Sequence, residues 1–195
     1  MRIISGEFKG KKLLQPIDNK TRPLKDLLKE SLFNILSHSK KIDVKIENSN
    51  VLDLFSGVGS FGLEALSRGA KNVIFVESYS NVLSVLKKNI SNLNVKEKAE
   101  ILEKDIFEHL NFDQFNNTFD MIFLDPPYDE KNISLIVSKI FKSKILSPKG
   151  LLILHRHKRE KDTFLDQFNI IEEKKYGISK AVSYTHLTLP KKRIV

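Results

Sequence analysis

The stretch Val51 to Gly62, VLDLFSGVGSFG, decides the fold of this chain. Its first five residues form an apolar run that predicts a buried strand. Glycines then recur as G-x-G-x-x-G from Gly57, and residues 63–68 have a helical pattern that ends at Gly69. Because glycine lets the backbone approach a ligand closely, this strand, loop and helix together predict a nucleotide-type binding turn.

Strands and helices alternate along the rest of the chain. Apolar runs predict strands at residues 72–76, 99–102, 119–124 and 151–154, and amphipathic segments predict helices at residues 81–92 and 133–141. A short helical turn is expected at 106–110 and a turn at 148–150. The alternation predicts an α/β fold in which helices cover both faces of a parallel sheet.

The first forty residues are predicted to form an extension before this sheet. Residues 2–16 predict a short hairpin, and Pro23 predicts the start of a helix in which leucines recur at helical spacing. Arg22 precedes that proline, where an N-terminal arm would meet the catalytic face. The basic residues that crowd the hairpin are Arg2, Lys9, Lys11 and Lys12. We expect the arm at residues 1–40 and the α/β core at residues 41–182.

Two carboxylates are placed to hold a cofactor. Glu77 ends the second strand, 18 residues beyond Gly59, where an acidic side chain can accept hydrogen bonds from both ribose hydroxyls of a nucleoside. Asp53, inside the strand before the loop, suits a cationic amino-acid group or the waters around it. NAD fits the loop and Glu77, but no second nucleotide-binding half follows. The pattern therefore favours S-adenosylmethionine.

Asp105 ends the third strand and has two interpretations. Its carboxylate can accept a hydrogen bond from an adenine amino group, with the amide of Ile106 bonding a ring nitrogen. It can also cap the short turn that follows it. The two roles are compatible.

The tetrapeptide Asp125-Pro126-Pro127-Tyr128 follows the apolar run of the fourth strand. The prolines end the strand and fix φ, so that neighbouring carbonyls point outward. The carboxylate and a carbonyl can accept hydrogen bonds from an exocyclic amino group, while the Tyr128 ring stacks on the base. The alternative is an ordinary loop after a strand, since Pro-Pro is common in turns.

The composition favours a polyanionic partner. The net charge is +9, which suits phosphate contacts, although a lysine-rich proteome from AT-biased coding explains it as well. The chain has no Cys, no apolar run long enough to span a membrane and no secretory signal, so we expect a cytoplasmic protein. The histidines do not form a metal site. Two basic segments, residues 155–159 and the helix face with Lys25 and Lys29, are interpreted either as phosphate contacts or as solvated charge.

Across residues 2–182 the chain resembles the RsmD-type family of bacterial 16S ribosomal RNA guanine-N2 methyltransferases. The matching segments are RIISGEFKGKKL, TRPLKDLLKESLFNIL, LDLFSGVGSFGLEALSRGA, FVE, KDIF, LDPPY and the late KYG. The resemblance implies a class I Rossmann-like methyltransferase with a small N-terminal hairpin and helix, and S-adenosylmethionine as donor. It implies that a guanosine of 16S rRNA is the acceptor, in free RNA, in the small subunit or in an assembly intermediate.

The resemblance also assigns residues by position. It implies that the catalytic residues are Asp125, Pro126, Pro127 and Tyr128. It implies that the cofactor is held by Asp53, Phe55, Gly57, Gly59, Glu77, Asp105 and Ile106. It implies that RNA is contacted by Arg2, Lys9, Lys11, Lys12 and Arg22.

Three segments depart from the family pattern. Leu24 and Leu27 replace a small hydroxyl residue and a basic one, and Ser78-Tyr79 differs from the commoner continuation after Glu77. The tail of residues 183–195 does not look like the family's last strand. It resembles translated adaptor sequence, and a replaced final strand would leave the sheet edge poorly formed.

Alternative functions remain open at this stage. An adenine-N6 methyltransferase acting on DNA or RNA would use the same tetrapeptide on another exocyclic amine. A non-catalytic ribosome-assembly factor would need none of the carboxylates Asp53, Glu77 and Asp125. A small-molecule methyltransferase would have little use for the basic arm. A monomer is expected in each case.

Overall fold

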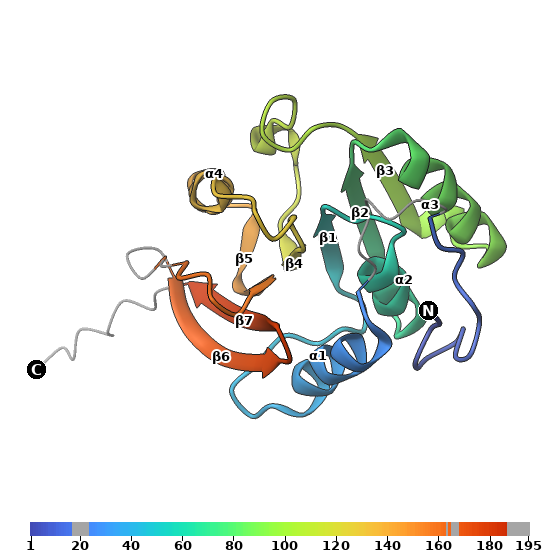
Figure 1. The fold of residues 1–195 in the computed structure, drawn as a ribbon, viewed down its shortest axis with the longest axis horizontal. Helices are drawn as coiled ribbons and strands as arrows, with labels where there is room; N and C mark the ends of the chain where they lie inside the picture. The colour runs from blue at the N-terminus through green and yellow to red at the C-terminus, as the bar shows by residue number, and fades with distance from the viewer. Residues whose placement is uncertain (17–23, 163, 165–167, 187–195) are drawn as a thin grey trace, which may run out of the picture.

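The computed structural model describes residues 1–16, 24–162, 164 and 168–186. Its centre is a seven-stranded sheet with the strand order β3-β2-β1-β4-β5-β7-β6 (Figure 1). The parallel strands are β1 (Asn50–Leu54), β2 (Asn72–Glu77), β3 (Ala99–Glu103), β4 (Phe119–Leu124) and β5 (Leu146–His157). Two further strands, β6 (Phe168–Tyr176) and β7 (Ser179–His186), run antiparallel at one edge. The predicted, mostly parallel α/β sheet is confirmed.

Helices cover both faces of this sheet, as the alternation predicted. The α-helices are α1 (Asp26–His38), α2 (Ser60–Ser67), α3 (Ser80–Asn92) and α4 (Ile133–Lys142), and the 3-10 helices are η1 (Lys96–Lys98) and η2 (Phe112–Gln114). Figure 1 shows α4 on one side of the sheet and α1, α2 and α3 on the other.

The two-residue period of the strands divides the buried side chains into two cores. On β4, Met121 and Phe123 pack with α1, α2 and α3, whereas Ile122 and Leu124 pack with α4. Phe61 on α2 stacks on Phe123 with ring centroids 4.0 Å apart. This contact fixes the start of α2, and with it the end of the glycine loop, against the centre of the sheet.

The parallel strands are in a register that brings their carboxyl ends together. Leu54 at the end of β1 pairs with Val76 on β2 and with Leu124 on β4, and Leu124 pairs with Leu154 on β5. In open parallel sheets ligands bind outside these ends, where the strand order reverses. Here the reversal lies between β1 and β4.

The N-terminal segment is hairpin-like but forms no regular strands. Arg2 and Lys12 form an isolated bridge, and the Ile3 amide donates to the Lys11 carbonyl at 2.9 Å. The segment lies against α2: Gly6 has φ of +85°, and a Cβ there would lie 1.8 Å from the carbonyl oxygen of Ser67. Only glycine fits at this point, so the predicted arm is docked on the core.

A buried carboxylate holds this segment in place. Glu64 on α2 is fully buried and accepts hydrogen bonds from the amides of Ile4 (2.7 Å) and Ser5 (3.0 Å) and from Nε of Arg68 (2.7 Å). Nζ of Lys29 lies 3.5 Å from Glu64 and donates to the Arg2 carbonyl at 2.6 Å. Burial lowers the pKa of Lys29, and the charge of Glu64 opposes that shift.

The interpretation of Lys29 as a solvated or phosphate-contacting residue is therefore wrong, because its side chain is fully buried against Glu64. Lys25 is exposed. The helix begins at Asp26, later than the expected start at Pro23, since Lys25 has an extended backbone with ψ of 141°. Residues 17–23, which include Arg22 and Pro23, lie outside the described residues.

The predicted turn at Pro148-Lys149-Gly150 lies within β5. Between the pairs Phe119–Leu146 and Met121–Leu151, β4 advances two residues while β5 advances five. The extra residues of β5 therefore form an irregularity that keeps the strand beside β4. The separate turn predicted from the Pro-Lys-Gly sequence is therefore wrong, since residues 148–150 belong to one continuous strand with a register shift.

Strand β7 extends past the predicted core boundary at residue 182. Tyr184 is buried and pairs with Leu152 on β5 and Ile170 on β6. The first four residues of the predicted tail, 183–186, thus complete a central antiparallel strand, and residues 187–195 lie outside the described residues. None of the described helices is both long and apolar enough to cross a membrane.

Replacing Glu64 by Ala should destabilise the protein strongly, because the change leaves the Lys29 ammonium buried without its carboxylate and removes the acceptor for two backbone amides. We expect the free energy of unfolding to fall by about 3–5 kcal/mol, measured by urea denaturation. The exposed Glu30 on α1 gives the matched control, and E30A should change stability by less than about 0.5 kcal/mol. Equal stability of E64A and E30A would contradict the conclusion that Glu64 holds the N-terminal segment in place.

Candidate active site

A cavity of about 990 Å³ opens at the carboxyl ends of the parallel strands. That volume lies at the upper end of the range for small-molecule sites, so it can take two nucleoside-sized groups. Each parallel strand, or the residues that follow it, contributes to the wall. The polar residues contributed in this way are Asp53, Glu77, Asp105, Asp125 and His155.

The glycine loop turns sharply under the cavity. Phe55 and Gly57 have positive φ values of 59° and 55°, and the Gly57 amide donates to Glu77 at 2.8 Å. Gly62 has no room for a side chain, since a Cβ would lie 2.3 Å from the Phe75 ring. The loop is therefore pulled tightly onto β2, and its backbone faces the cavity.

Gly59 has a different role from the one expected. It caps α2 with φ of +82°, and a Cβ there would lie 2.5 Å from Leu86 on α3. Its neighbours Val58 and Ser60 line the cavity, but Gly59 itself does not. The expectation that Gly59 touches the cofactor is not supported by its position, which serves helix packing.

Asp53 is the most buried carboxylate of the cavity wall. It is 1 % exposed, and its Oδ2 accepts a hydrogen bond from the Gly62 amide at 3.0 Å. Burial raises the pKa of Asp53 well above its ordinary value; the Gly62 hydrogen bond opposes the shift, and the charges of Asp125 and Glu77 add to it. A cation bound beside Asp53 would offset the cost of burying its negative charge.

Glu77 is held rigidly at the end of β2. One carboxylate oxygen accepts from Gly57, and the other accepts from the amides of Ser78 and Tyr79, each at 2.9 Å. The residue is half-buried and lines the cavity. Because its hydrogen bonds come from backbone, the carboxylate is pre-oriented toward hydroxyl donors in the cavity.

Asp105 caps the turn after β3 and also lines the cavity. Its Oδ1 accepts from the amides of Phe107 (2.8 Å) and Glu108 (3.0 Å), which is the capping role foreseen from the sequence. Ile106 lies beside it in the wall. The geometry leaves the second oxygen of Asp105 for a ligand, so the two interpretations are compatible.

Two serine hydroxyls give an independent test of whether a polar cofactor fits. Oγ of Ser56 and Oγ of Ser60 are buried and have no hydrogen-bond partner among the described residues. Both residues line the cavity beside Asp53. Buried polar groups normally have partners, so these hydroxyls indicate a ligand with polar atoms at the glycine loop. The residues present fit the amino-acid end of S-adenosylmethionine.

The Asp125–Tyr128 tetrapeptide lines the same cavity as the glycine loop, after the neighbouring strand β4. The Asp125 amide donates to the Leu54 carbonyl at 3.3 Å, which ties the loop to β1. Nη1 of Arg156 donates to the Pro127 carbonyl at 3.3 Å. Asp125 Oδ1 lies 2.7 Å from His155 Nδ1. The tetrapeptide is thus held on both sides by neighbouring strands.

Tyr128 lies edge-on between two histidines of β5. Its ring centroid is 5.9 Å from that of His155 and 5.6 Å from that of His157. The prediction that residues 155–159 form a basic rim or a solvated run is wrong for two of them, because His155 and Arg156 are 6 % and 2 % exposed. Both lie in the part of β5 that pairs with β7, His155 opposite Ala181 and Arg156 opposite Lys180.

Two further elements line the cavity, although the sequence did not indicate that they would. The start of α1 contributes Leu24, Leu27 and neighbours, and the turn between β6 and β7 contributes Tyr176 to Ser179. A hydrogen bond of 2.6 Å between Ser31 and Tyr176 joins these two elements. The late KYG motif was the available signal, but β6 and β7 themselves were not predicted.

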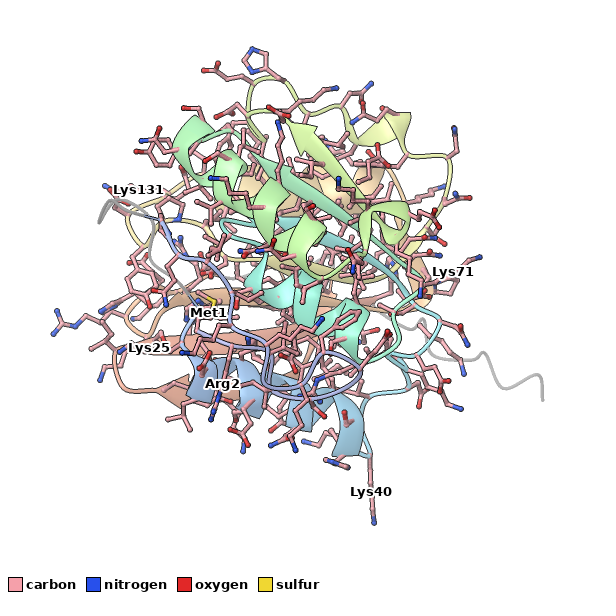
Figure 2. The ribbon with its side chains drawn as sticks, turned by 90° about the vertical axis from the view of Figure 1, so that its right-hand side faces the viewer. Met1, Arg2, Lys25, Lys40, Lys71 and Lys131 are labelled. Atoms are coloured by element: carbon pink, nitrogen blue, oxygen red, sulfur yellow. The ribbon has the colours of Figure 1, made fainter. Side chains whose placement is uncertain are left out.

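Four of the predicted RNA-contacting residues do not line the cavity. Arg2, Lys9, Lys11 and Lys12 are exposed on the N-terminal segment, whereas Arg22 lies outside the described residues. Figure 2 looks onto the face that carries Met1, Arg2 and Lys25. A contact of these residues with RNA stays a prediction.

Comparison with known proteins identifies the family. Residues 1–185 match the family model described as "Conserved hypothetical protein 95", and the chain belongs to this family. Ribosomal RNA small subunit methyltransferase D of Haemophilus influenzae is 35 % identical over 185 residues, 94 % of this chain and 91 % of that protein. The protein of the same name from Buchnera aphidicola (Acyrthosiphon pisum) is 31 % identical over 81 % of this chain and 78 % of that protein.

Solved structures confirm the class I methyltransferase fold. The Haemophilus influenzae protein HI0767, described as a candidate methylase, has a TM-score of 0.76 at 32 % identity and covers 96 % of this chain and 99 % of its own. The Escherichia coli protein yhhF, described as a candidate methyltransferase, has a TM-score of 0.78 at 25 % identity, with 95 % and 97 % covered. The chain is accordingly a methyltransferase of the RsmD type.

In the ligand-free protein, the stability of D53N should increasingly exceed that of the wild type as the pH rises. The raised pKa of Asp53 means that its contribution to stability is present when the group is protonated and is lost as the pH rises through the folded-state pKa. Asn cannot ionise, so the melting temperature of D53N should exceed that of the wild type in mildly alkaline buffer and approach it in acid. The same variant should bind S-adenosylmethionine more weakly.

Melting curves over a pH series test this, with the exposed Asp113→Asn as control. D113N should follow the wild type at every pH. A D53N protein that is no more stable than the wild type in alkaline buffer would contradict the account of Asp53.

Proposed function

We propose that this chain transfers the methyl group of S-adenosylmethionine to the exocyclic N2 of a guanosine in 16S ribosomal RNA. The observation that carries the proposal is that the glycine loop and the Asp125–Tyr128 tetrapeptide line the same cavity. One wall suits a charged nucleoside cofactor, and the other suits a planar base that carries an amino group. Two relatives named for small-subunit ribosomal RNA methylation support this choice of acceptor.

The cofactor wall contains a partner for each part of the donor. Glu77 would accept from the ribose hydroxyls, and Asp105 with the Ile106 amide would hold the adenine. Asp53 and the two unpaired serine hydroxyls would hold the amino-acid end. All of these residues line the cavity, and the described hydrogen bonds of Glu77 and Asp105 fix their carboxylates before binding.

The chemistry of the acceptor wall follows from its groups. When bound, S-adenosylmethionine supplies an electrophilic methyl group on a sulfonium sulfur. That methyl group would pass to the exocyclic nitrogen, with the electron pair of the broken methyl–sulfur bond left on sulfur. Asp125 orients the amine by accepting a hydrogen bond from it, Tyr128 stacks on the base, and the surplus amine proton passes to Asp125 or to solvent.

The surface charge supports an RNA acceptor. With a net charge of +9 and exposed Arg2, Lys9, Lys11 and Lys12 on one segment, the chain can bind phosphates on either side of a nucleotide that enters the cavity. Arg22 is part of the same proposal but lies outside the described residues. We place the catalytic domain in the cytoplasm, with the small subunit or its assembly intermediate as substrate.

Transfer of labelled methyl to small-subunit particles from cells that lack the enzyme tests the proposal, followed by nucleoside analysis. The expected product is N2-methylguanosine at one position. N6-methyladenosine would keep the cofactor and overturn the acceptor. A protein that neither binds S-adenosylmethionine nor transfers methyl to any ribosomal RNA substrate would favour the non-catalytic assembly factor.

Replacing Asp125 by Ala should abolish most turnover while leaving cofactor affinity nearly unchanged, because its carboxylate serves the acceptor. We expect kcat to fall by about a hundredfold or more. The matched control is D129A, since Asp129 is exposed and follows the same tetrapeptide without lining the cavity. D125A with near-wild-type methylation would remove Asp125 from the mechanism.

Replacing Glu77 by Ala should instead weaken cofactor binding, by about tenfold or more in Kd, since a pre-oriented charged acceptor is lost. Isothermal titration calorimetry with S-adenosylmethionine measures it. Glu103 offers a close control because it pairs with Glu77 at the end of the neighbouring strand but does not line the cavity. E103A should bind like the wild type, and unchanged affinity in E77A would exclude Glu77 from the site.

A further inference from the structure

His155 is a buried titratable side chain of the cavity that the proposed function leaves without a role. It lies on β5, is 6 % exposed and lines the cavity together with Asp125. The parallel register explains the pairing: Leu124 on β4 is opposite Leu154 on β5, so the next residue of each strand is Asp125 and His155. The 2.7 Å contact between them is therefore fixed by the backbone of the sheet.

The contact determines which ring nitrogen carries a proton. A carboxylate can only accept hydrogen bonds, so Nδ1 of His155 must donate to Asp125 Oδ1. Nε2 is buried and has no partner among the residues that the structure describes. The contact with Asp125 is therefore the one hydrogen bond of the imidazole within this part of the chain.

This arrangement divides the two oxygens of Asp125. Oδ1 is occupied by His155, whose side chain is 7 % exposed, while the Asp125 side chain is 20 % exposed toward the cavity. Oδ2 is left for a donor that enters the cavity. The edge of the Tyr128 ring packs against His155 at 5.9 Å, so the imidazole also borders the aromatic group that would contact the base.

We propose that His155 is a positioning residue that acts through Asp125. By donating from Nδ1 it holds the carboxylate in one orientation, with Oδ2 toward the exocyclic amine of the acceptor base. This inference rests on the proposed function and adds a residue to it. His155 does not touch the reacting atoms, so its removal should lower the rate of methyl transfer without weakening the binding of RNA or of S-adenosylmethionine.

The test compares His155→Leu, His155→Asn and His157→Asn in the methyl-transfer assay, with kcat and the KM for RNA measured at saturating S-adenosylmethionine. H155L fills the space without a donor, whereas the amide of H155N can donate from about the place of Nδ1. H157N is the matched control, because His157 is two residues along the same strand and its Nδ1 accepts from the Arg159 amide instead of meeting Asp125.

We expect kcat of H155L to fall by about tenfold or more, the effect of losing a hydrogen bond to a charged group. KM for RNA and Kd for the cofactor should stay within about twofold, since the lost interaction is made in the transfer step. H155N should keep most of the wild-type kcat. H157N loses a ring contact with Tyr128 but no contact with Asp125, so its kcat should fall by less than that of H155L. A merely structural role would not give this split between kcat and KM or rescue by Asn.

Three results would overturn the inference. They are a folded H155L with wild-type kcat, a loss of activity that lies in cofactor affinity, and an H155N as impaired as H155L. If H155L does not fold, judged by its melting curve, H155Q replaces it. The glutamine amide extends past the Nδ1 position, so H155Q should also lack the donor to Asp125 and show the same fall in kcat. A wild-type protein that methylates no RNA would instead be a failure of the proposed function, which separates the two outcomes.

Discussion

The register of the parallel strands is the constraint on which the rest of this structure depends. Leu54, Val76, Leu124 and Leu154 lie in one row across β2, β1, β4 and β5. The residues that follow them therefore emerge at one edge of the sheet. A shift of one residue in any strand would turn a buried carboxylate toward a helix and a leucine toward the cavity.

The same register explains why the cavity contains so many acidic groups. Asp53 and Glu77 arrive from adjacent strands and, with Asp125, repel one another, and that repulsion contributes to the raised pKa of Asp53. Backbone amides at Glu77 and the imidazole at Asp125 offset part of this cost. Within the described residues, the Gly62 amide is the one hydrogen-bond partner of Asp53, so part of the cost of burying its charge remains. This is consistent with a site shaped for a cation.

The parts of the site that could be predicted from sequence are those in which one short segment carries both the fold signal and the chemistry. Residues 51–62 and 125–128 are of this kind, because apolar runs, glycines and prolines act locally. The contacts that hold the N-terminal segment could not be predicted in this way. In the sequence Lys29 looks like a surface lysine, and only the structure shows it buried against Glu64, 35 residues away. His155 and Arg156 likewise resembled a basic rim, since only the pairing of β5 with β7 shows them to be buried. Strands β6 and β7 escaped prediction because β6 is largely polar and exposed at the sheet edge.

The central claim is that one cavity places a methyl donor against the Asp125–Tyr128 tetrapeptide. A crystal structure of the protein with S-adenosylhomocysteine, the demethylated cofactor, tests it most directly. The account predicts the ribose hydroxyls at Glu77, the amino-acid end beside Asp53 and the sulfur directed toward Asp125 and Pro126. A cofactor bound elsewhere, or bound with its sulfur directed away from the tetrapeptide, would contradict the account.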